Sequence, residues 1–293
     1  MRAMYKFAGL LLALPLVACN VGSVDGPGSP GDQPDAGATD DIDAPVPPGE
    51  MQVSGTISAS ATWSGTIDVV GNTTIASGVT VTVMAGSVVR IADSGSFLVR
   101  GVLDLQGTAA AKITVKPSGN FHGGFYADGG GQLKLAYVVL TGGGVHTGTG
   151  GTATVTDTKM SHVGGDLLTM EGGTIDVQYS QIGLDPGGTD TTHCEMHFDG
   201  NDTISVTHTN IGTGVYGVMF YGGTHAVFTN DNWYSNGEYS VHTVSPTGGQ
   251  QGVSGDFTGS WFDKNDVLKA AGTNLTGIVV NPQAPRNTAG PRG

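Results

Sequence analysis

The sequence has few of the residues on which many binding functions depend. Its two cysteines, Cys19 and Cys194, are too few for a disulfide framework. Only 13% of its 293 residues are charged, and the 104 positions between Lys159 and Lys264 hold neither lysine nor arginine. Phosphates and polyuronates are bound by clustered cations, so this gap and the net charge of −13 argue against nucleic acid and against acidic polysaccharides as partners.

Helical periodicity is also missing from the sequence. Glycine supplies 50 of the 293 residues, but it shows no three-residue period, which excludes a collagen-like chain. Aromatic residues make up 7% and apolar residues 38%, enough for a lean core. From residue 51 onward, short runs of β-forming residues alternate with pairs of glycines, and this pattern predicts an all-β body.

The first 18 residues read as a secretory signal. A positively charged start precedes an apolar run, residues 7–17, that is shorter than the ~20 residues needed to span a bilayer. The run ends in Leu16-Val17-Ala18-Cys19, which resembles the lipobox of bacterial lipoproteins. The resemblance implies removal of residues 1–18, acylation of Cys19 and a membrane as partner through this lipid anchor. The alternative is a plain signal peptide followed by a chance cysteine.

Residues 19–50 are predicted to be a tether. Positions 20–50 hold six prolines, six glycines and seven acidic residues, with no basic or aromatic residue. Such a composition buries too little apolar surface to offset the entropy of ordering. Asn20, which follows the lipobox cysteine, implies by the same resemblance a location at the outer membrane or cell surface.

The rest of the chain contains an internal repeat. Apolar residues recur at positions i, i+2 and i+7, which predicts a strand with one face inward, a tight turn and a second strand. The copies are Leu133-Leu135-Leu140, Ala153-Val155-Met160, Ile175-Val177-Ile182, Ile204-Val206-Ile211 and Ala226-Phe228-Trp233. A small polar residue stands three positions after the second apolar one in four copies, which suggests an internal hydrogen-bonded ladder of Thr158, Ser180, Thr209 and Asp231.

The spacing of the repeat predicts a parallel β-solenoid of about ten coils over residues 51–285. Equivalent positions lie 20, 22, 29 and 22 residues apart, and residues 183–193 supply the extra loop of the longest copy. A β-sandwich is the alternative, but it would not produce a regular repeat. Residues 275–285 are expected to form the last strand, and residues 286–293 a tail that is a short cap or a frayed end.

The N-terminal part of the repeat resembles a known fold family. The segments TIASGVTVTVMAGSVVRI and SFLVRGVLDLQGT resemble the opening coils of right-handed parallel β-helix proteins of the pectate-lyase-like superfamily. This resemblance implies a single-stranded, right-handed β-helix. It does not imply an activity, because the architecture serves lyases, hydrolases, adhesins and structural proteins alike.

The densest group of chemically active side chains lies within residues 185–202. Strand alternation predicts that Met196 and Phe198 point inward, and that Glu195, His197 and Asp199 point outward. Such an outward face is a candidate site for Zn²⁺ or Ca²⁺, and no other cofactor is expected. The candidate metal ligands are His193, Glu195, His197, Asp185 and Asp190. The alternative is a solvated polar face.

Two further features are open to alternative interpretations. Cys194 beside His193 could form a Cys–His nucleophile, but it carries no protease signature, and a buried structural cysteine is the simpler reading. Aromatic residues crowd into positions 216–239, where Tyr221 and Tyr234 could offer an exposed stacking platform for a sugar ring, with His242 continuing the same face. Alternatively, these rings only close the wall of a wider coil.

Two function classes follow from these features. The first is a lipid-anchored surface protein with a structural, adhesive or carbohydrate-binding role, for which glycan is the expected partner. The second is a polysaccharide-degrading enzyme, a lyase or glycoside hydrolase, that acts in a groove of the solenoid. The long stretch without cations favours the first class, and no catalytic residue can be named from the sequence.

Overall fold

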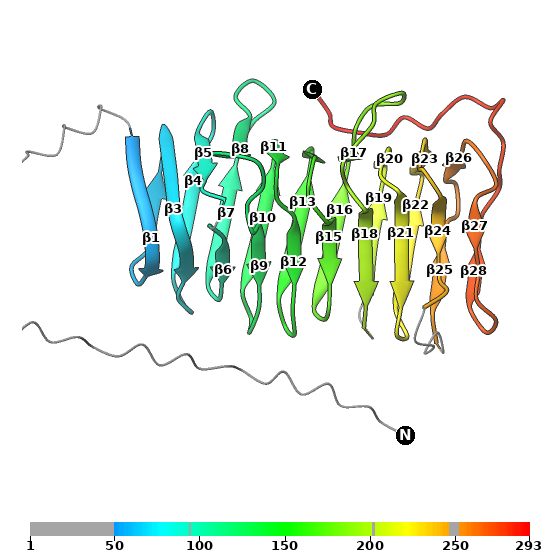
Figure 1. Ribbon diagram of the computed structural model, residues 1–293, viewed down its shortest axis with the longest axis horizontal. Helices are drawn as coiled ribbons and strands as arrows, with labels where there is room; N and C mark the ends of the chain where they lie inside the picture. The colour runs from blue at the N-terminus through cyan, green and yellow to red at the C-terminus, as the bar shows by residue number, and fades with distance from the viewer. Residues whose placement is uncertain (1–49, 94, 201–202, 246–251) are drawn as a thin grey trace, which may run out of the picture. The chain divides into compact units, whose positions relative to one another are not determined.

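The structure is a computed structural model that describes residues 50–93, 95–200, 203–245 and 252–293. This part of the chain is built from 28 strands joined by turns and loops (Figure 1). Within it, no helix is long and apolar enough to pass through a membrane. The predicted signal peptide and the tether up to residue 49 lie outside the described residues, and Glu50 already belongs to the first strand.

The strands form a parallel β-solenoid in which each turn contributes one strand to each of three faces. The first face is a sheet of ten parallel strands, so the chain makes about ten turns and the predicted fold is confirmed. Its strands, in order along the stack, are β2 (Ala61–Trp63), β4 (Thr80–Met84), β7 (Val102–Gln106), β10 (Gln132–Ala136), β13 (Thr152–Thr156), β16 (Thr174–Gln178), β19 (Thr203–Thr207), β22 (His225–Thr229), β25 (Ser254–Asp256) and β28 (Asn274–Thr276).

The other 18 strands make one sheet that bends into a second and a third face. The two faces are joined because β1 (Glu50–Ile57) and β3 (Thr66–Ile75) each run along both. The second face continues with β5 (Val88–Ile91), β8 (Ile113–Pro117), β11 (Val138–Thr141), β14 (Lys159–Ser161), β17 (Gln181–Gly183), β20 (Asn210–Gly212), β23 (Asn232–Tyr234) and β26 (Trp261–Phe262). The third face continues with β6 (Phe97–Val99), β9 (Phe125–Ala127), β12 (Val145–Thr147), β15 (Asp166–Met170), β18 (Cys194–Asp199), β21 (Tyr216–Tyr221), β24 (Tyr239–His242) and β27 (Val267–Leu268).

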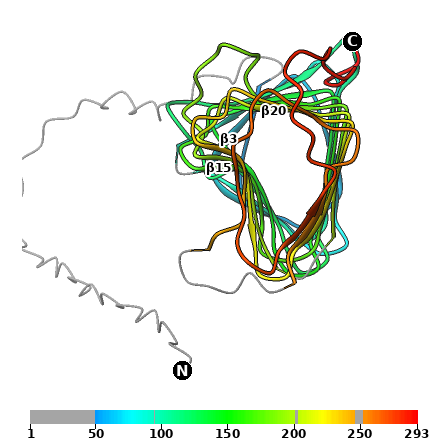
Figure 2. The same cartoon turned by 90° about the vertical axis from the view of Figure 1, so that its right-hand side faces the viewer.

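The turns lie over one another along the stack (Figure 2), and their inward side chains form columns. On the first face, the parallel register pairs consecutive members of a single column, none of them more than 1% exposed: Leu135, Val155, Val177, Val206 and Phe228. On the second face, Leu140, Met160 and Ile182 pair in the same way. The repeat therefore predicted the registers correctly, because a shift by one residue would turn each apolar column toward solvent.

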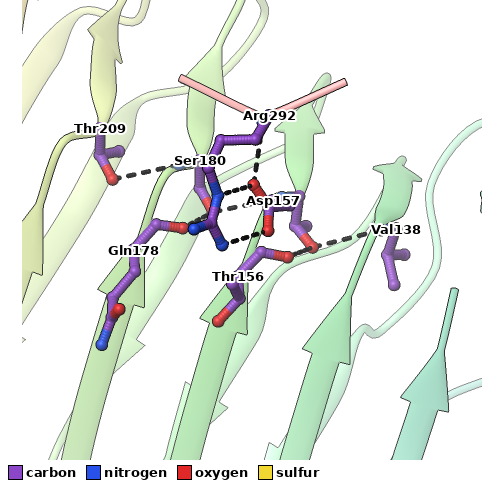
Figure 3. A network of polar contacts seen from close by, with 8 residues as sticks. Val138, Thr156, Asp157, Gln178, Ser180, Thr209 and Arg292 are labelled. Atoms are coloured by element: carbon purple, nitrogen blue, oxygen red, sulfur yellow. Dashed lines mark hydrogen bonds and ion pairs between the residues drawn. The ribbon is translucent and has the colours of Figure 1, made fainter. Parts of the chain in front are cut away.

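A hydrogen-bonded ladder runs through the corner between the first and second faces. The hydroxyl of Thr158 accepts from the backbone N–H of Val138 at 3.2 Å, and the hydroxyl of Ser180 accepts from Thr158 N–H at 3.2 Å. Thr209 and Asp231 continue this pattern at 3.3 and 2.7 Å. Each rung satisfies a buried N–H that the tight turn leaves without a backbone partner, so the predicted ladder is confirmed (Figure 3).

The residue before each rung adopts a left-handed backbone conformation. Its φ lies between 47° and 61° in five successive turns, at Tyr137, Asp157, Tyr179, His208 and Asn230. This conformation is uncommon outside glycine, but it lets the chain turn from the first face to the second within a few residues. The corner thus has one geometry that is repeated from turn to turn.

The C-terminal tail lies along this corner and connects distant turns. Gly290 N–H donates to the carbonyl of His208 at 2.8 Å, and Arg292 bonds both carboxylate oxygens of the buried Asp157 at 2.9 and 2.7 Å. Lys112 reaches the carbonyl of the last residue, Gly293, at 2.8 Å. The expectation of a cap or a frayed end is therefore wrong, since the tail runs back over the turns (Figure 1).

One smaller expectation about the chain also needs adjustment. The last strand, β28, covers only Asn274–Thr276, so the predicted strand over residues 275–285 is too long.

Glycines recur where the third face returns to the first, and at Gly131 and Gly151 a Cβ atom would overlap a backbone carbonyl of the preceding turn. Close stacking of the turns at this corner accounts for part of the high glycine content.

Candidate functional site

The outer side of the third face carries a dense group of titratable and aromatic side chains. We call the outward residues of β15, β18, β21 and β24, with those that adjoin them, the polar face. Its members are Asp166, Glu171, His193, Cys194, His197, Asp199, Tyr216, Met219, Tyr221, Tyr239 and His242. The parallel register places His197 beside Met219 and Met219 beside His242, so the predicted continuation of the column to His242 is correct.

Strand alternation fails at the start of β18. Met196 and Phe198 point inward and Asp199 is exposed, as predicted, but Cys194, Glu195 and Met196 are all buried. The prediction that Glu195 points outward is wrong. Its carboxylate lies in the corner between the second and third faces and accepts a hydrogen bond from Gly214 N–H at 2.7 Å.

Two glycines make room for Glu195 in this corner. A Cβ atom on Gly183 would overlap the carboxylate, and one on Gly214 would lie 2.9 Å from Oε1, so only glycines make room for it. Burial raises the pKa of Glu195 well above its ordinary value. The structure therefore removes Glu195 from the exposed candidates for ligand or metal binding.

Asp166, at the start of β15, is the centre of the polar network on this face. Oδ1 lies 3.1 Å from His193 Nδ1 and accepts from Cys194 N–H at 3.0 Å, while Oδ2 lies 3.0 Å from His197 Nδ1. Burial alone would raise the pKa of Asp166, but the hydrogen bonds from His197 and His193 outweigh it and lower the pKa to about 2. The carboxylate is thus ionised and tied to both histidines.

Cys194 is buried but has polar neighbours on the outer side. Its Sγ atom lies 3.2 Å from His193 Nδ1 and 3.1 Å from Met219 Sδ. A Cys–His–Asp triad needs thiol and carboxylate on different ring nitrogens, whereas here both face Nδ1. Burial also raises the pKa of the thiol, so the arrangement disfavours a thiolate nucleophile and agrees with the simpler reading of a buried cysteine.

The aromatic side chains divide between the polar face and the interior. Tyr221 lies on the outer side of β21 but is only 7% exposed, so the prediction of an exposed stacking ring is wrong for Tyr221. Its OH lies 3.2 Å from His242 Nδ1, and its ring meets the His197 ring edge-on at 5.7 Å. Tyr216 and Tyr239 stack with ring centroids 6.3 Å apart. Burial raises the pKa of Tyr221 to about 12, so its OH stays protonated at neutral pH.

Tyr234 does not belong to this platform, contrary to the prediction. It is 1% exposed, and its OH donates to the carbonyl of Leu184 at 3.0 Å and accepts from Gln181 Nε2 at 2.6 Å. The Arg286 guanidinium of the C-terminal tail lies 4.7 Å from the centre of its ring. Tyr234 therefore secures the loop of residues 184–193 and the tail.

A hollow opens on the polar face beside this network. Its volume is about 620 Å³, and it is lined by Asp166, Thr169, Met170, Glu171, His197 and Asp199. Glu171 and Asp199 are exposed, and no lysine or arginine lines it. The size is within the range of ligand sites, roughly 300–1,000 Å³, but the lining is more acidic than usual.

The structure also changes the list of candidate ligands for a metal. Asp190 uses its carboxylate to accept from the N–H groups of His162 and Thr191, and Asp185 is exposed on the loop. The donors that come together are instead Asp166, His193 and Cys194. Asp166 was not among the predicted ligands, although aligning Leu168 and Met170 with Met196 and Phe198 would have placed it beside Cys194.

Comparisons of the chain with protein-family models, with curated proteins and with solved structures find no match. The function is therefore inferred from the residues of the polar face themselves.

Proposed function

We propose that this protein is displayed on the bacterial cell surface through a lipid on Cys19 and binds a neutral polysaccharide on its polar face. The observation that carries the proposal is the hollow lined by Asp166, Glu171, His197 and Asp199, on the same face as the partly exposed, stacked rings of Tyr216 and Tyr239. Carboxylates accept hydrogen bonds from sugar hydroxyls, and tyrosine rings pack on the apolar faces of sugars. The absence of lysine and arginine from residues 160–263 disfavours anionic polymers.

The repetitive architecture suits a polymeric ligand. Successive turns are about 4.8 Å apart, so a glycan lying along the stack meets equivalent positions on successive turns. Tyr216 and Tyr239 repeat in this way on β21 and β24, and Tyr126 and His146 extend the outward aromatic groups to β9 and β12. The polar face would therefore bind an extended chain rather than a single sugar.

Binding is best tested with the full chain and a panel of xylan, mannan and mixed-linkage glucan, with polygalacturonate as the anionic polymer. The paired change Glu171→Gln with Asp199→Asn keeps the size of both side chains and is expected to lower the affinity for the retained neutral polymer at least tenfold. Asp185→Asn, which removes an exposed charge on the loop, is the matched control and should have no effect. Retention of polygalacturonate alone, or of no polymer, would contradict the proposal.

The lipid anchor is tested separately. Cys19→Ser is expected to release the protein from the membrane fraction without altering its binding of polysaccharide, because the change lies outside the solenoid. If the variant still sediments with membranes, the lipobox reading is wrong.

A glycoside hydrolase acting in the same hollow is the second candidate function. It is favoured by the presence of two exposed carboxylates, Glu171 and Asp199, on adjacent turns of one hollow, since two carboxyl groups suffice for hydrolysis of a glycosidic bond. Release of reducing ends from the bound polymer, lost in Glu171→Gln, would establish this activity.

A further inference from the structure

Three donor atoms of different chemistry face one another at the edge of the polar face. His193 Nδ1 lies 3.1 Å from Asp166 Oδ1 and 3.2 Å from Cys194 Sγ, and all three atoms lie within 4.8 Å of one another. They come from two adjacent turns, because Asp166 begins β15 and pairs with Cys194 at the start of β18. This convergence depends on the break in strand alternation that turns Cys194 toward the outer side.

We propose that Asp166, His193 and Cys194 bind one thiophilic divalent metal ion, with Zn²⁺ as the representative. Zinc bonds to sulfur at about 2.3 Å and to nitrogen and oxygen at about 2.0–2.2 Å, so tetrahedral donors lie about 3.3–3.7 Å apart. The separations of 3.1 and 3.2 Å are only a few tenths of an ångström shorter. A thiol, an imidazole and a carboxylate suit zinc, whereas Ca²⁺ takes oxygen ligands alone.

The surroundings hold these donors in place. His197 Nδ1 lies 3.0 Å from the second oxygen of Asp166, and Cys194 N–H donates to the first, so the carboxylate is fixed with Oδ1 toward His193. Partners of this kind orient metal ligands and affect affinity by about 10–100-fold. The loop that delivers His193 is itself anchored, because Tyr216 N–H donates to the carbonyl of His193 at 2.9 Å.

The site is open on one side. The side chain of His193 is 55% exposed, whereas Cys194 is buried beneath it against Met219. Three protein donors and an accessible position are the arrangement of zinc sites that keep a place for water or for a bound ligand. Since Asp166 also lines the hollow, the ion would lie at the edge of the proposed polysaccharide surface.

A bare hydrogen-bonded cluster is the competing explanation of this geometry. In it, His193 Nδ1–H donates to Asp166 Oδ1 and the Cys194 thiol donates to Met219 Sδ, 3.1 Å away. A metal ion would instead take the thiolate, the imidazole and the carboxylate as ligands together, so uptake of a metal ion distinguishes the two arrangements.

Cobalt substitution tests the site directly. The full chain, carrying Cys19→Ser so that Cys194 is its only thiol, is titrated with Co²⁺ while the thiolate-to-cobalt charge-transfer absorption is recorded. One Co²⁺ per chain is expected, with a band that Zn²⁺ displaces and that Cys194→Ser abolishes. His193→Ala is expected to lower the affinity at least tenfold, and it should preserve the fold because that side chain is exposed.

His225→Ala is the matched control, since His225 is an exposed histidine on the first face. It should leave both affinity and band unchanged. Absence of Co²⁺ binding, binding without a thiolate band, or an affinity unchanged in His193→Ala would each overturn the proposal.

Discussion

The corner between the first and second faces repeats one kind of side chain from turn to turn, whereas the outer side of the third face does not. At the corner, every turn must satisfy the same buried N–H, and a small polar side chain does so at Thr158, Ser180 and Thr209. On the third face, the paired positions Asp166, Cys194 and Tyr216 have nothing in common. The comparison indicates that the repeat is kept where it holds the turns together and abandoned where the side chains are free to serve binding.

The inward column of the first face is expected to give the largest effect on the free energy of unfolding, and the outward positions beside it almost none. Phe228→Ala removes a ring that is 0% exposed and stacks against Phe257, and it should cost about 3–5 kcal/mol in free energy of unfolding. The neighbouring Val227→Ala, on the outer side of β22, should change stability by no more than about 0.5 kcal/mol. Denaturant unfolding of both variants checks the pair, and equal losses would mean that the register is wrong.

The C-terminal tail should contribute the next largest effect. Arg292→Ala leaves the buried Asp157 without its guanidinium partner and is expected to lower the free energy of unfolding at neutral pH. Burial by itself would raise the pKa of Asp157, but hydrogen bonding to Arg292 lowers the pKa below its ordinary value. The stabilisation is therefore present above the unfolded pKa of about 3.9 and is lost as the pH falls through the folded value.

Unfolding of wild type and Arg292→Ala across the acid range checks this sign. The two free energies of unfolding should converge as the pH falls. Arg292→Lys keeps the charge without the paired hydrogen bonds and should lie between them. A difference that stays constant with pH would mean that the ion pair does not stabilise the tail.

Removing a single rung of the ladder is expected to lower stability somewhat less. Thr209→Val keeps the shape of the side chain but leaves the buried Ser180 N–H without an acceptor, at a cost of about 1–3 kcal/mol. Thr154→Val, on the exposed side of β13, is the control and should be neutral. Thermal unfolding of the two variants decides whether the hydroxyls stabilise the corner or merely occupy it.

Asp231 forms the one rung of this ladder whose contribution to stability is expected to depend on pH. Burial raises the pKa of Asp231 well above its ordinary value, so its contribution is present below the unfolded pKa of about 3.9 and is lost as the pH rises toward the folded value. Asp231→Asn should reduce this loss of stability toward neutral pH, whereas the exposed Asp185→Asn should not. An unchanged pH profile in Asp231→Asn would mean that Asp231 is ionised in the fold.

The repetitive features of the molecule could be predicted from the sequence because each follows from one turn's geometry. The inner columns follow from the two-residue alternation, and the ladder from the recurrence of Thr158, Ser180 and Thr209 at one position. The inward turn of Glu195 could not be predicted, because it depends on the space that Gly183 and Gly214 leave in a corner of neighbouring turns. Tyr234 was misplaced for the same reason.

Contacts between segments far apart in the sequence were equally inaccessible. Arg292 meets Asp157 across 135 positions, and nothing in either local sequence indicates the pairing. Asp166 was missed because its role depends on the side chain of the next turn. The site could thus be located from the density of active side chains, whereas its geometry required the structure.

The account's central claim is that the polar face binds ligand while the ladder corner holds the turns together. One comparison tests it most directly: the affinity for the retained neutral polysaccharide and the unfolding temperature of the double variant Glu171→Gln with Asp199→Asn, both exposed in the hollow, beside those of Thr209→Val. We expect the double variant to lose at least tenfold in affinity while its unfolding temperature falls by only a few degrees, roughly 2–4 °C per kcal/mol. Thr209→Val should keep its affinity and lose stability. A double variant that binds as wild type does, or that fails to fold, would contradict the claim.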